Sequence, residues 1–411
     1  MNNQFELLSP AGDLERLETA LRFGADAVYC GGPMLQLRSG NVGFTMESLA
    51  IGVKKCHEKG KKIYVTVNAF ANNSEVDAVS DYARALYDMG VDAVIVSDLG
   101  LISRIRKTVP DLPVHVSTQA NCLNYAAANA YYDMGVKRIV LGREMSLKEI
   151  RELRKRIPDD LELEAFVHGA MCMSYSGRCM ISAYLTDRSA NRGACTQSCR
   201  WKFHLTEETR PGEFFPVVED ERGTTILSSF DMNCIDFLDQ IMEAGVVSFK
   251  LEGRMKSPFY VATVTNAYRK RIDGILSGTA TKESVQLLRR ELCAASHRPY
   301  ASGFYFGEMK KHAPDDGVYL QDTNFVGVVK EIKDGRVFVE IRNRIFAGDR
   351  IEILSPDTLN EAFTANNIID MNGESVEAAS RPGEIYSMDL TCKASPGDLL
   401  RIRIKTQRLL R

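Results

Sequence analysis

The chain has 411 residues, of which 45% are hydrophobic and 26% are charged. These proportions are typical of a folded globular protein with a large core, and the length suggests two or three domains. Lysine and arginine total 52 against 54 aspartates and glutamates, so the formal net charge of −2 excludes a histone-like polycation and an acidic tail protein.

Short apolar runs alternate with amphipathic stretches from the first residues to about residue 270. We expect strands at 5–8, 26–30, 62–67, 92–96, 114–116, 138–141, 163–167 and 247–251. Runs rich in valine and isoleucine, separated by helical patterns, indicate buried parallel strands joined by crossover helices.

Several of the expected helices end in a glycine just before the next strand, at Gly24, Gly90, Gly135 and Gly245. Glycine is favoured there because it adopts the left-handed conformation that ends many helices. The phrase recurs along the chain, as expected of a barrel built from similar units. The sequence therefore predicts an α/β fold with a TIM-like (β/α) barrel, and a doubly wound open sheet is the alternative.

One interruption, from about Gly169 to Thr225, is too long and too rich in cysteine for an ordinary loop between strand and helix. It leaves the C-terminal end of a predicted strand, which is where such barrels place their chemistry. We therefore expect this Cys-rich insertion to belong to a functional site.

After the barrel pattern the hydrophobic periodicity changes. From Asn324 onward it is two, and strands are expected at 325–330, 336–341 and 349–354, separated by turns such as Asp334-Gly335. The predicted organisation is a barrel domain at 1–272 with its insertion at about 169–225, a helical linker at 273–323, and a small antiparallel β-barrel domain at 324–411.

Half of the ten cysteines lie in the window that runs from Cys172 to Cys234. They are Cys172, Cys179, Cys195, Cys199 and Cys234, and their loop-type neighbours argue against five separate core residues. Several thiols in one loop favour a soft metal. Zinc would accept four thiolates, but paired C-x2-C knuckles are missing, so the spacing favours an iron–sulfur cluster and leaves zinc as the alternative.

Residues 164–182 read EAFVHGAMCMSYSGRCMIS. This segment resembles the signature of the collagenase-like peptidase family U-32, E-x-F-x-x-G-[SA]-[LIVM]-C-x4-G-x-C-x-[LIVM]-S, at every fixed position. Further phrases that resemble the family are LLSPAGD at 7–13, DAVYCGG at 26–32 and KLEGRMKSPFY at 250–260. The resemblance covers the barrel and extends into the tail.

The resemblance implies a function. Members with understood chemistry are oxygen-independent hydroxylation proteins associated with 4Fe–4S clusters, and they act on a tRNA wobble uridine, a ribosomal cytidine or ubiquinone precursors. A barrel followed by one small β domain is most similar to the tRNA-uridine branch, for which prephenate is the implied hydroxyl source. The resemblance therefore implies an enzyme, or a component of one, for prephenate-dependent 5-hydroxylation of the wobble uridine. Its partners would be tRNA, prephenate, and a second subunit or an electron donor.

The same resemblance implies a ligand set for the cluster. Cys172, Cys179, Cys195 and Cys234 match the family pattern, and Cys199 is then a spare thiol or an alternative fourth ligand.

Polar residues that follow the predicted strands are the candidates for substrate binding, because a barrel opens to its substrate at that end. Arg254 and Lys256 are expected to bind the carboxylates of prephenate, since arginine suits bidentate carboxylate binding. Asn68 and Gln119 are expected to add hydrogen bonds. For each of them, a salt bridge at the rim or a hydrogen bond at a strand end is the structural alternative.

Three further residues near the barrel mouth are expected to take part in catalysis. His168 lies inside the family signature, and it is the candidate for proton transfer because a histidine side chain can move a proton near neutral pH. Arg143 and Glu252 follow predicted strands and would supply charge beside the substrate.

Two stretches are candidates for RNA binding. Residues 137–156 hold eight basic and three acidic residues, and the last eleven residues, RIRIKTQRLLR, hold five basic residues and no acid. Such runs suit phosphate contacts, although they are also common on solvated surfaces. We expect the tail domain to dock tRNA.

Two other functions are alternatives. The family name suggests a collagenase-like peptidase of unknown catalytic type, yet none of the six histidines lies in a recognisable protease motif and H-E-x-x-H is missing. The other alternative is a non-catalytic tRNA-binding protein with a structural cluster.

The sequence also indicates a location. The longest stretch without a charged residue, 112–132, contains a proline, a histidine and several amides, so it is not a membrane span. The start, MNNQFELLSPAG, shows no basic segment followed by an apolar one, so no secretion signal is visible. We expect a cytoplasmic protein with reduced cysteines and no membrane partner.

Overall fold

The chain forms two compact units. The computed structural model describes residues 5–37, 43–172, 179, 181–198, 218–220, 223–225, 230–307, 319–358 and 361–409. The barrel unit comprises Met1–Leu21, Ala25–Lys256 and Arg298–Val318, and the C-terminal unit comprises Arg22–Gly24, Ser257–His297 and Tyr319–Arg411. The domain boundaries expected at residues 272 and 323 stay a prediction.

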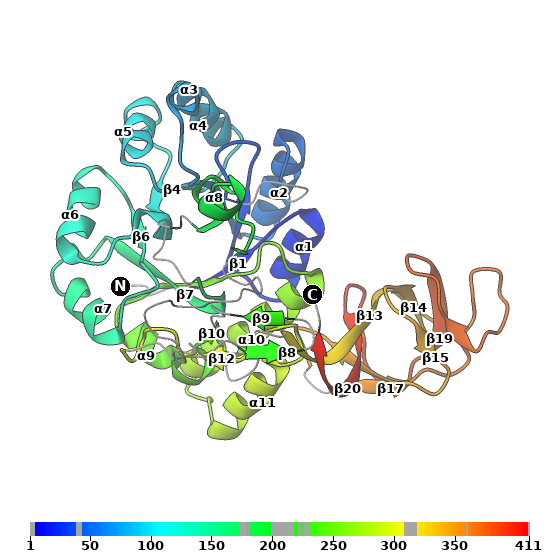
Figure 1. The fold of residues 1–411 in the computed structure, drawn as a ribbon. Coiled ribbons are helices and arrows are strands. Elements are labelled where there is room, and N and C mark those ends of the chain that lie inside the picture. The colour runs from blue at the N-terminus through cyan, green and yellow to red at the C-terminus, as the bar shows by residue number, and fades with distance from the viewer. Residues whose placement is uncertain are drawn as a thin grey trace. The chain divides into compact units, whose positions relative to one another are not determined.

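Eight parallel strands form a closed barrel in the barrel unit (Figure 1). They pair in chain order, and the last strand pairs with both the first and the seventh, which closes the ring. The expected (β/α) barrel is therefore confirmed, and the doubly wound open sheet is wrong. The strands are β1 (Glu6–Pro10), β2 (Ala27–Gly31), β3 (Lys62–Val67), β4 (Ala93–Val96), β5 (Val114–Val116), β6 (Arg138–Val140), β7 (Glu162–Ala170) and β11 (Ser248–Leu251).

Helices lie outside these strands (Figure 1). Their starts are fixed by side chains that accept a backbone hydrogen bond, for example Thr45, Asp98 and Ser146. The glycines predicted to end helices all have positive φ, between 83° and 97°. The helices are α1 (Leu14–Arg22), α2 (Met46–Glu58), α3 (Asn73–Val76), α4 (Val79–Asp88), α5 (Leu99–Thr108), α6 (Tyr125–Asp133), α7 (Leu147–Arg154) and α9 (Leu238–Glu243).

The region of the expected insertion adds short elements beside the barrel. β10 (Asp231–Asn233) runs antiparallel to β7 and pairs with β12 (Tyr300–Ala301). A buried ion pair between Arg298 and Asp231, at 2.7 Å, fixes this extension. The described elements within the expected insertion are α8 (Ile181–Thr186), β8 (Val218–Asp220), β9 (Gly223–Thr225) and the 3-10 turn η2 (Ala190–Arg192). Two further 3-10 turns lie elsewhere, η1 (Thr118–Ala120) after β5 and η4 (Ile235–Phe237) after β10.

The C-terminal unit contains α10 (Pro258–Leu276), α11 (Lys282–Leu292) and a six-stranded antiparallel sheet. The expected antiparallel domain is thus confirmed. The sheet order is β17 (Ala362–Thr364), β16 (Arg350–Leu354), β20 (Leu399–Leu409), β13 (Tyr319–Lys333), β14 (Arg336–Ile341) and β19 (Ile385–Asp389), with a separate pair β15 (Ile345–Phe346) and β18 (Ala378–Ala379). No helix in the described part of the chain is long and apolar enough to cross a membrane.

The basic end of the chain forms β20, which lies inside this sheet rather than apart from it. Arg401 is 1% exposed and pairs with Glu291 and Glu352, and Arg403 pairs with the same two carboxylates. Two of the five basic residues expected to meet phosphate are therefore already neutralised within the unit. These ion pairs could not be predicted from the sequence, because Glu352 and Glu291 lie 49 and 110 residues from Arg401.

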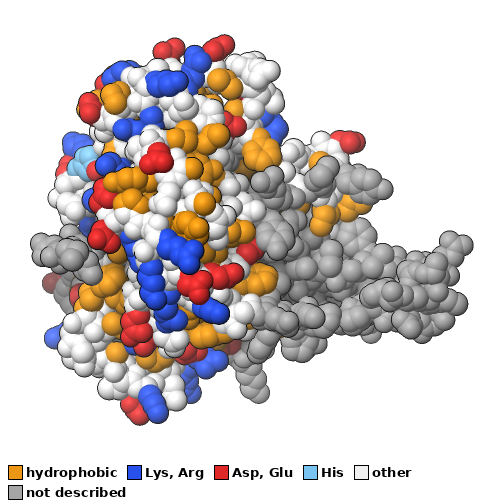
Figure 2. Space-filling view, turned by 90° about the vertical axis from the view of Figure 1, so that its left-hand side faces the viewer, with side chains coloured by type: hydrophobic (Ala, Val, Ile, Leu, Met, Phe, Trp, Pro, Cys, Tyr) orange, Lys and Arg blue, Asp and Glu red, His pale blue; other side chains and the backbone are white. Residues whose placement is uncertain are grey.

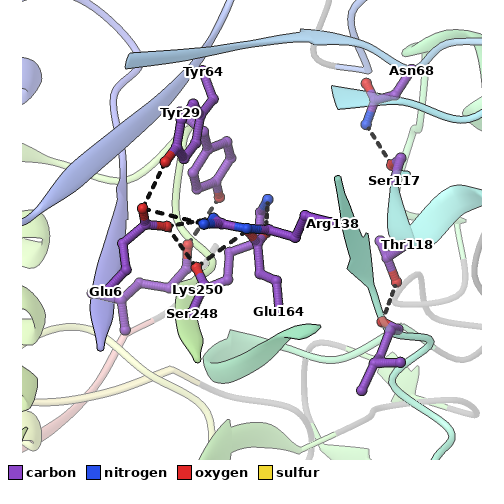
Figure 3. Close-up of polar contacts among 12 residues, drawn as sticks. Glu6, Tyr29, Tyr64, Asn68, Ser117, Thr118, Arg138, Glu164, Ser248 and Lys250 are labelled. Atoms are coloured by element: carbon purple, nitrogen blue, oxygen red, sulfur yellow. Dashed lines mark hydrogen bonds and ion pairs between the residues drawn. The ribbon is translucent and has the colours of Figure 1, made fainter. Parts of the chain in front are cut away.

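The barrel interior holds a network of buried charges (Figure 3). Arg138 on β6 is 4% exposed and pairs with Glu6 of β1 and with Glu164 of β7. Lys250 of β11 pairs with the other oxygen of Glu164 at 2.6 Å. Two cations and two carboxylates thus alternate across four strands, which neutralises charges that would be costly to bury alone.

Hydroxyl groups complete the hydrogen bonding of this network. Tyr64 donates to Glu6 Oε2 at 2.6 Å, and Ser248 donates to Glu6 Oε1 at 2.8 Å. Burial by itself raises the pKa of Glu6, but the Arg138 charge and these hydrogen bonds outweigh it and hold the pKa below its ordinary value. Glu6 is therefore ionised at neutral pH.

We predict that Arg138→Met lowers the free energy of unfolding by about 3–5 kcal/mol, because it leaves Glu6 and Glu164 with an uncompensated buried charge. Chemical denaturation followed by circular dichroism measures the effect. The control is Arg104→Met, since Arg104 pairs with Asp77 at an exposed position and should lose less than about 1 kcal/mol. Equal losses in the two variants would contradict the prediction.

Candidate functional site

The C-terminal ends of the barrel strands surround a small cavity of about 80 Å³. Sites that bury a whole drug-sized ligand usually measure roughly 300–1,000 Å³, so this cavity suits one end of a ligand. The lining residues come from seven of the eight barrel strands or the loops that follow strands: Tyr29, Leu37, Thr66, Asn68, Ile95, Ser117, Thr118, Gln119, Val140, Arg143, Phe166, Lys250, Glu252 and Arg254.

Arg254, the residue expected to bind a carboxylate, lines this cavity. It is 5% exposed, and its Nη1 donates a hydrogen bond to Thr66 Oγ1 at 2.9 Å. The backbone at Gly31 leaves space for the Gln36 side chain and for the guanidinium, because a Cβ added there would clash with Gln36 Oε1 and would lie 2.8 Å from Arg254 Nη1. The glycine of the DAVYCGG phrase thus has a steric role beside the cavity.

Arg143 is a second cation of the cavity. Its guanidinium lies 4.1 Å from the centre of the Phe166 ring, and Nη1 donates to the Ala170 carbonyl oxygen at 2.8 Å. Stacking on the ring and this hydrogen bond fix the orientation of the side chain.

Lys250 is the third cation and lies deeper, since it precedes Glu252 and Arg254 along the chain. Burial lowers the pKa of Lys250 below its ordinary value, while the Glu164 carboxylate acts in the opposite direction. The lining residues thus include three cations and the carboxylate of Glu252, and Lys250 is paired with Glu164 behind it. One formal positive charge remains in excess, an arrangement that favours an anionic ligand.

Neutral hydrogen-bonding groups also line the cavity. Asn68 Nδ2 donates to Ser117 Oγ at 3.1 Å, and Thr118 Oγ1 donates to the Leu141 carbonyl oxygen at 3.0 Å (Figure 3). Asn68 Oδ1 is buried and has no hydrogen-bond partner within the described structure, so it remains available to accept one from a ligand. Gln119, which follows Thr118 in the chain, lines the cavity as well.

Glu252 is held at the cavity by its backbone. Its N–H donates to the His168 carbonyl oxygen at 2.9 Å. Gly169 has φ +108°, and a Cβ there would lie 2.8 Å from the Glu252 carbonyl oxygen. The glycine of the signature is therefore needed for the close approach of β7 to the loop after β11.

Two of the expected site residues do not line the cavity. His168 is 1% exposed, and its ring lies 5.4 Å from the ring of Tyr300. Lys256 is half-buried, and its carbonyl oxygen accepts a hydrogen bond from Arg16 Nε at 2.6 Å. The five expected residues at the cavity are Arg143, Glu252, Arg254, Asn68 and Gln119, and all seven roles stay predictions.

The four expected cluster ligands are all among the described residues and are thiols, not members of a disulfide. Cys172 and Cys195 are exposed, Cys179 is half-buried, and Cys234 is buried directly after β10. The side chain of Asn191 holds the Cys179 peptide from both sides, by accepting from its N–H and donating to its carbonyl oxygen. The donor set is right in kind for a thiolate-bound cluster.

The ligand set itself is a prediction that the structure leaves open. Within the described residues, no three His, Cys, Asp or Glu side chains are placed to hold a metal ion. Cys199, the alternative fourth ligand, lies outside the described residues.

Comparison with known proteins identifies the family. Residues 12–314 match the model of Peptidase family U32, and residues 321–401 match that of the Peptidase family U32 C-terminal domain. The chain belongs to peptidase family U32.

Three relatives show the range of names within the family. The chain is 36% identical to "tRNA hydroxylation protein P" of Escherichia coli, over 93% of this chain and 92% of that protein. It is 38% identical to "tRNA hydroxylation protein P1" of Bacillus subtilis, over 96% and 94% respectively. It is also 33% identical to "Collagenase" of Porphyromonas gingivalis, over 97% of both chains.

Some cavity residues were not assigned to the site from the sequence. Tyr29, Thr66 and Phe166 lie within strands that are buried on both faces, so no alternation of polar and apolar residues marks the inward side. Lys250 differs from them, because its place at the end of a predicted strand and in the family phrase KLEGRMKSPFY already indicates the barrel mouth.

The basic stretch 137–156 is only partly available at the surface. Figure 2 shows lysine and arginine side chains in a band on the face that carries α6 and α7, with acidic side chains among them. Within the stretch, however, Arg138 is buried, Arg143 lines the cavity, and Arg154 donates to the Leu161 carbonyl oxygen at 2.6 Å. The count of charges in the sequence therefore overstates the positive surface.

His115 lies in the barrel interior, 5% exposed, with its ring 4.8 Å from that of Tyr64. Burial, aided by the positive charges of Arg138, Lys250 and Lys62, lowers its pKa well below the ordinary value. The unfolded chain therefore binds a proton near pH 6.5 that the folded chain does not bind, so stability falls as the pH drops below that value.

We predict that His115→Gln removes this part of the acid sensitivity. Between pH 6.5 and 5, the free energy of unfolding of the variant should fall less steeply than that of the parent, by up to about 1.4 kcal/mol per pH unit. Urea unfolding at a series of pH values measures the slopes. The control is His57→Gln, at an exposed position on α2, in which the free energy of unfolding should fall with pH as steeply as in the parent. Equal slopes for the parent and His115→Gln would show that His115 does not cause the acid sensitivity.

Proposed function

We propose that this protein hydroxylates RNA, and that its reaction is the 5-hydroxylation of the wobble uridine of tRNA with prephenate as hydroxyl source. The observation that carries the proposal is the similarity to two proteins named for tRNA hydroxylation, over more than nine-tenths of this chain and of each relative. Those names specify neither the uridine nor prephenate nor a cluster, and these three belong to the proposal alone.

The cavity supports a dicarboxylate as co-substrate. Arg254 and Arg143 present guanidinium groups from different strand ends, and each could bind a carboxylate. Desolvating a carboxylate without a cation is costly, whereas two anionic groups would balance these charges. Asn68 and Gln119 could orient the ligand through hydrogen bonds, and Glu252 could hold a proton beside it.

The nucleobase would reach this cavity from outside. A uridine in a single-stranded loop can be splayed away from its neighbours and presented to a barrel mouth, which a paired base cannot. The exposed lysines and arginines around α7 would then contact phosphates, and such contacts weaken with salt.

A 4Fe–4S cluster is part of the proposal. Cys172, Cys179, Cys195 and Cys234 would hold it, and when bound it would supply one-electron chemistry. The buried Cys234 and the backbone of Cys179, held by Asn191, would provide the fixed side of that site.

We predict that the parent gene restores 5-hydroxyuridine derivatives to tRNA in a strain that lacks its counterpart, and that Arg254→Met restores at most about a tenth, because the ligand loses a buried cation. Mass spectrometry of nucleosides from purified tRNA measures both. The control Arg104→Met changes an arginine remote from the cavity and should match the parent.

The peptidase named in the family is the competing function. It would be favoured if the parent gene left the wobble nucleosides unchanged while the pure protein cleaved gelatin. Cleavage alone, with restored nucleosides, would not displace RNA hydroxylation.

We predict that Cys234→Ala, purified without oxygen, loses the visible absorption of the cluster and most of its iron, because one of four thiolates is missing. The control Cys56→Ala alters a buried cysteine of α2 and should retain the parent's iron content. Absorption spectra and iron analysis of the two variants measure the loss of the cluster. Full iron retention in Cys234→Ala would exclude Cys234 as a ligand.

A further inference from the structure

Lys250 occupies an unusual position for a lysine. It is 4% exposed, yet it lines the cavity together with Arg143 and Arg254. Its ammonium nitrogen lies 4.4 Å from the centre of the Tyr29 ring and 5.6 Å from that of Phe166. Because both rings also line the cavity, the ammonium lies at the cavity wall and not behind it.

The Glu164 carboxylate holds the Lys250 ammonium in position. The carboxylate is fully buried, and its Oε1 lies 2.6 Å from Lys250 Nζ while Oε2 accepts from Arg138 at 3.1 Å. An ammonium has three donor hydrogens, and Glu164 uses one of them. The flexible stem of the lysine is thus held in one place, with donor capacity left for a ligand.

We propose that Lys250 contacts the bound co-substrate directly, as the hydrogen-bond donor and positive charge for one oxygen of a small dicarboxylate, and that Glu164 is the positioning residue that holds it there. The inference rests on the proposed function for the class of ligand. Beyond that function, the inference names the Lys250 ammonium as the protein group that contacts the end of the ligand lying deepest in the cavity. The alternative is that Lys250 serves only to neutralise Glu164 in the core.

A double variant separates these two roles. Lys250→Met alone would leave Glu164 short of one cation and could prevent folding. Lys250→Met with Glu164→Gln removes one charge of each sign, so the buried network stays neutral. The double variant is therefore expected to unfold within a few degrees of the parent, while the donor at the cavity wall is lost.

The experiment is calorimetric titration of prephenate into the purified full chain. We expect the double variant to bind about tenfold to a hundredfold more weakly than the parent, the loss of one hydrogen bond to a charged group. The control Lys62→Met, at the exposed start of β3, should bind like the parent. Parent-like binding by a folded double variant would overturn the proposal.

Glu164→Gln alone tests the positioning role. The variant keeps Lys250 but removes the carboxylate charge that favours the protonated form of its side chain. Prephenate binding should therefore weaken by several fold. As the pH is raised, binding should also disappear at a lower pH in the variant than in the parent. An unchanged pH profile would overturn the role of Glu164. A parent that restores wobble nucleosides in cells but binds no prephenate would overturn the Lys250 contact and leave RNA hydroxylation standing.

Discussion

The burial of ionised groups inside the barrel is the constraint on which the rest of the structure depends. Glu6, Arg138, Glu164 and Lys250 come from four strands, and none would be tolerated there without its partners. Their pairing links the strands that close the ring, β1, β7 and β11, and it extends to the wall of the cavity. Stability and ligand binding therefore share one set of charges, so a substitution chosen for the site also acts on the core.

Much of the fold was predictable because its signal is local. The eight barrel strands are continuous apolar runs, and helix-ending glycines precede several of them. The number of strands and the fold class therefore follow from the apolar runs and from the glycines between them. β10 and β12 were missed because three and two residues give no periodicity. β10 pairs with the end of β7, and β12 in turn pairs with β10, so both depend on partners that are distant in the sequence.

The candidate site was predictable in part, for a different reason. Residues that follow parallel strands meet at one end of a barrel, and this placed Arg143, Glu252, Arg254, Asn68 and Gln119 around one cavity. The remaining features depend on pairs far apart in the chain, such as Arg138 with Glu6 at 132 residues and Lys250 with Glu164 at 86. No spacing rule predicts such pairs, and the same holds for Arg401 in the C-terminal sheet.

The charges at the cavity also bear on the conflict between the two names found in the family. Lys250 is already paired with Glu164 at 2.6 Å, so the other charged lining residues are Arg143, Arg254 and Glu252, with a formal excess of one positive charge. A neutral peptide that filled the cavity would not compensate this excess, whereas an anionic ligand would, and its ring or chain could lie against Phe166 and Tyr29. The electrostatics of the lining therefore favour a small anionic ligand over a neutral peptide, on grounds that are independent of what any relative is called.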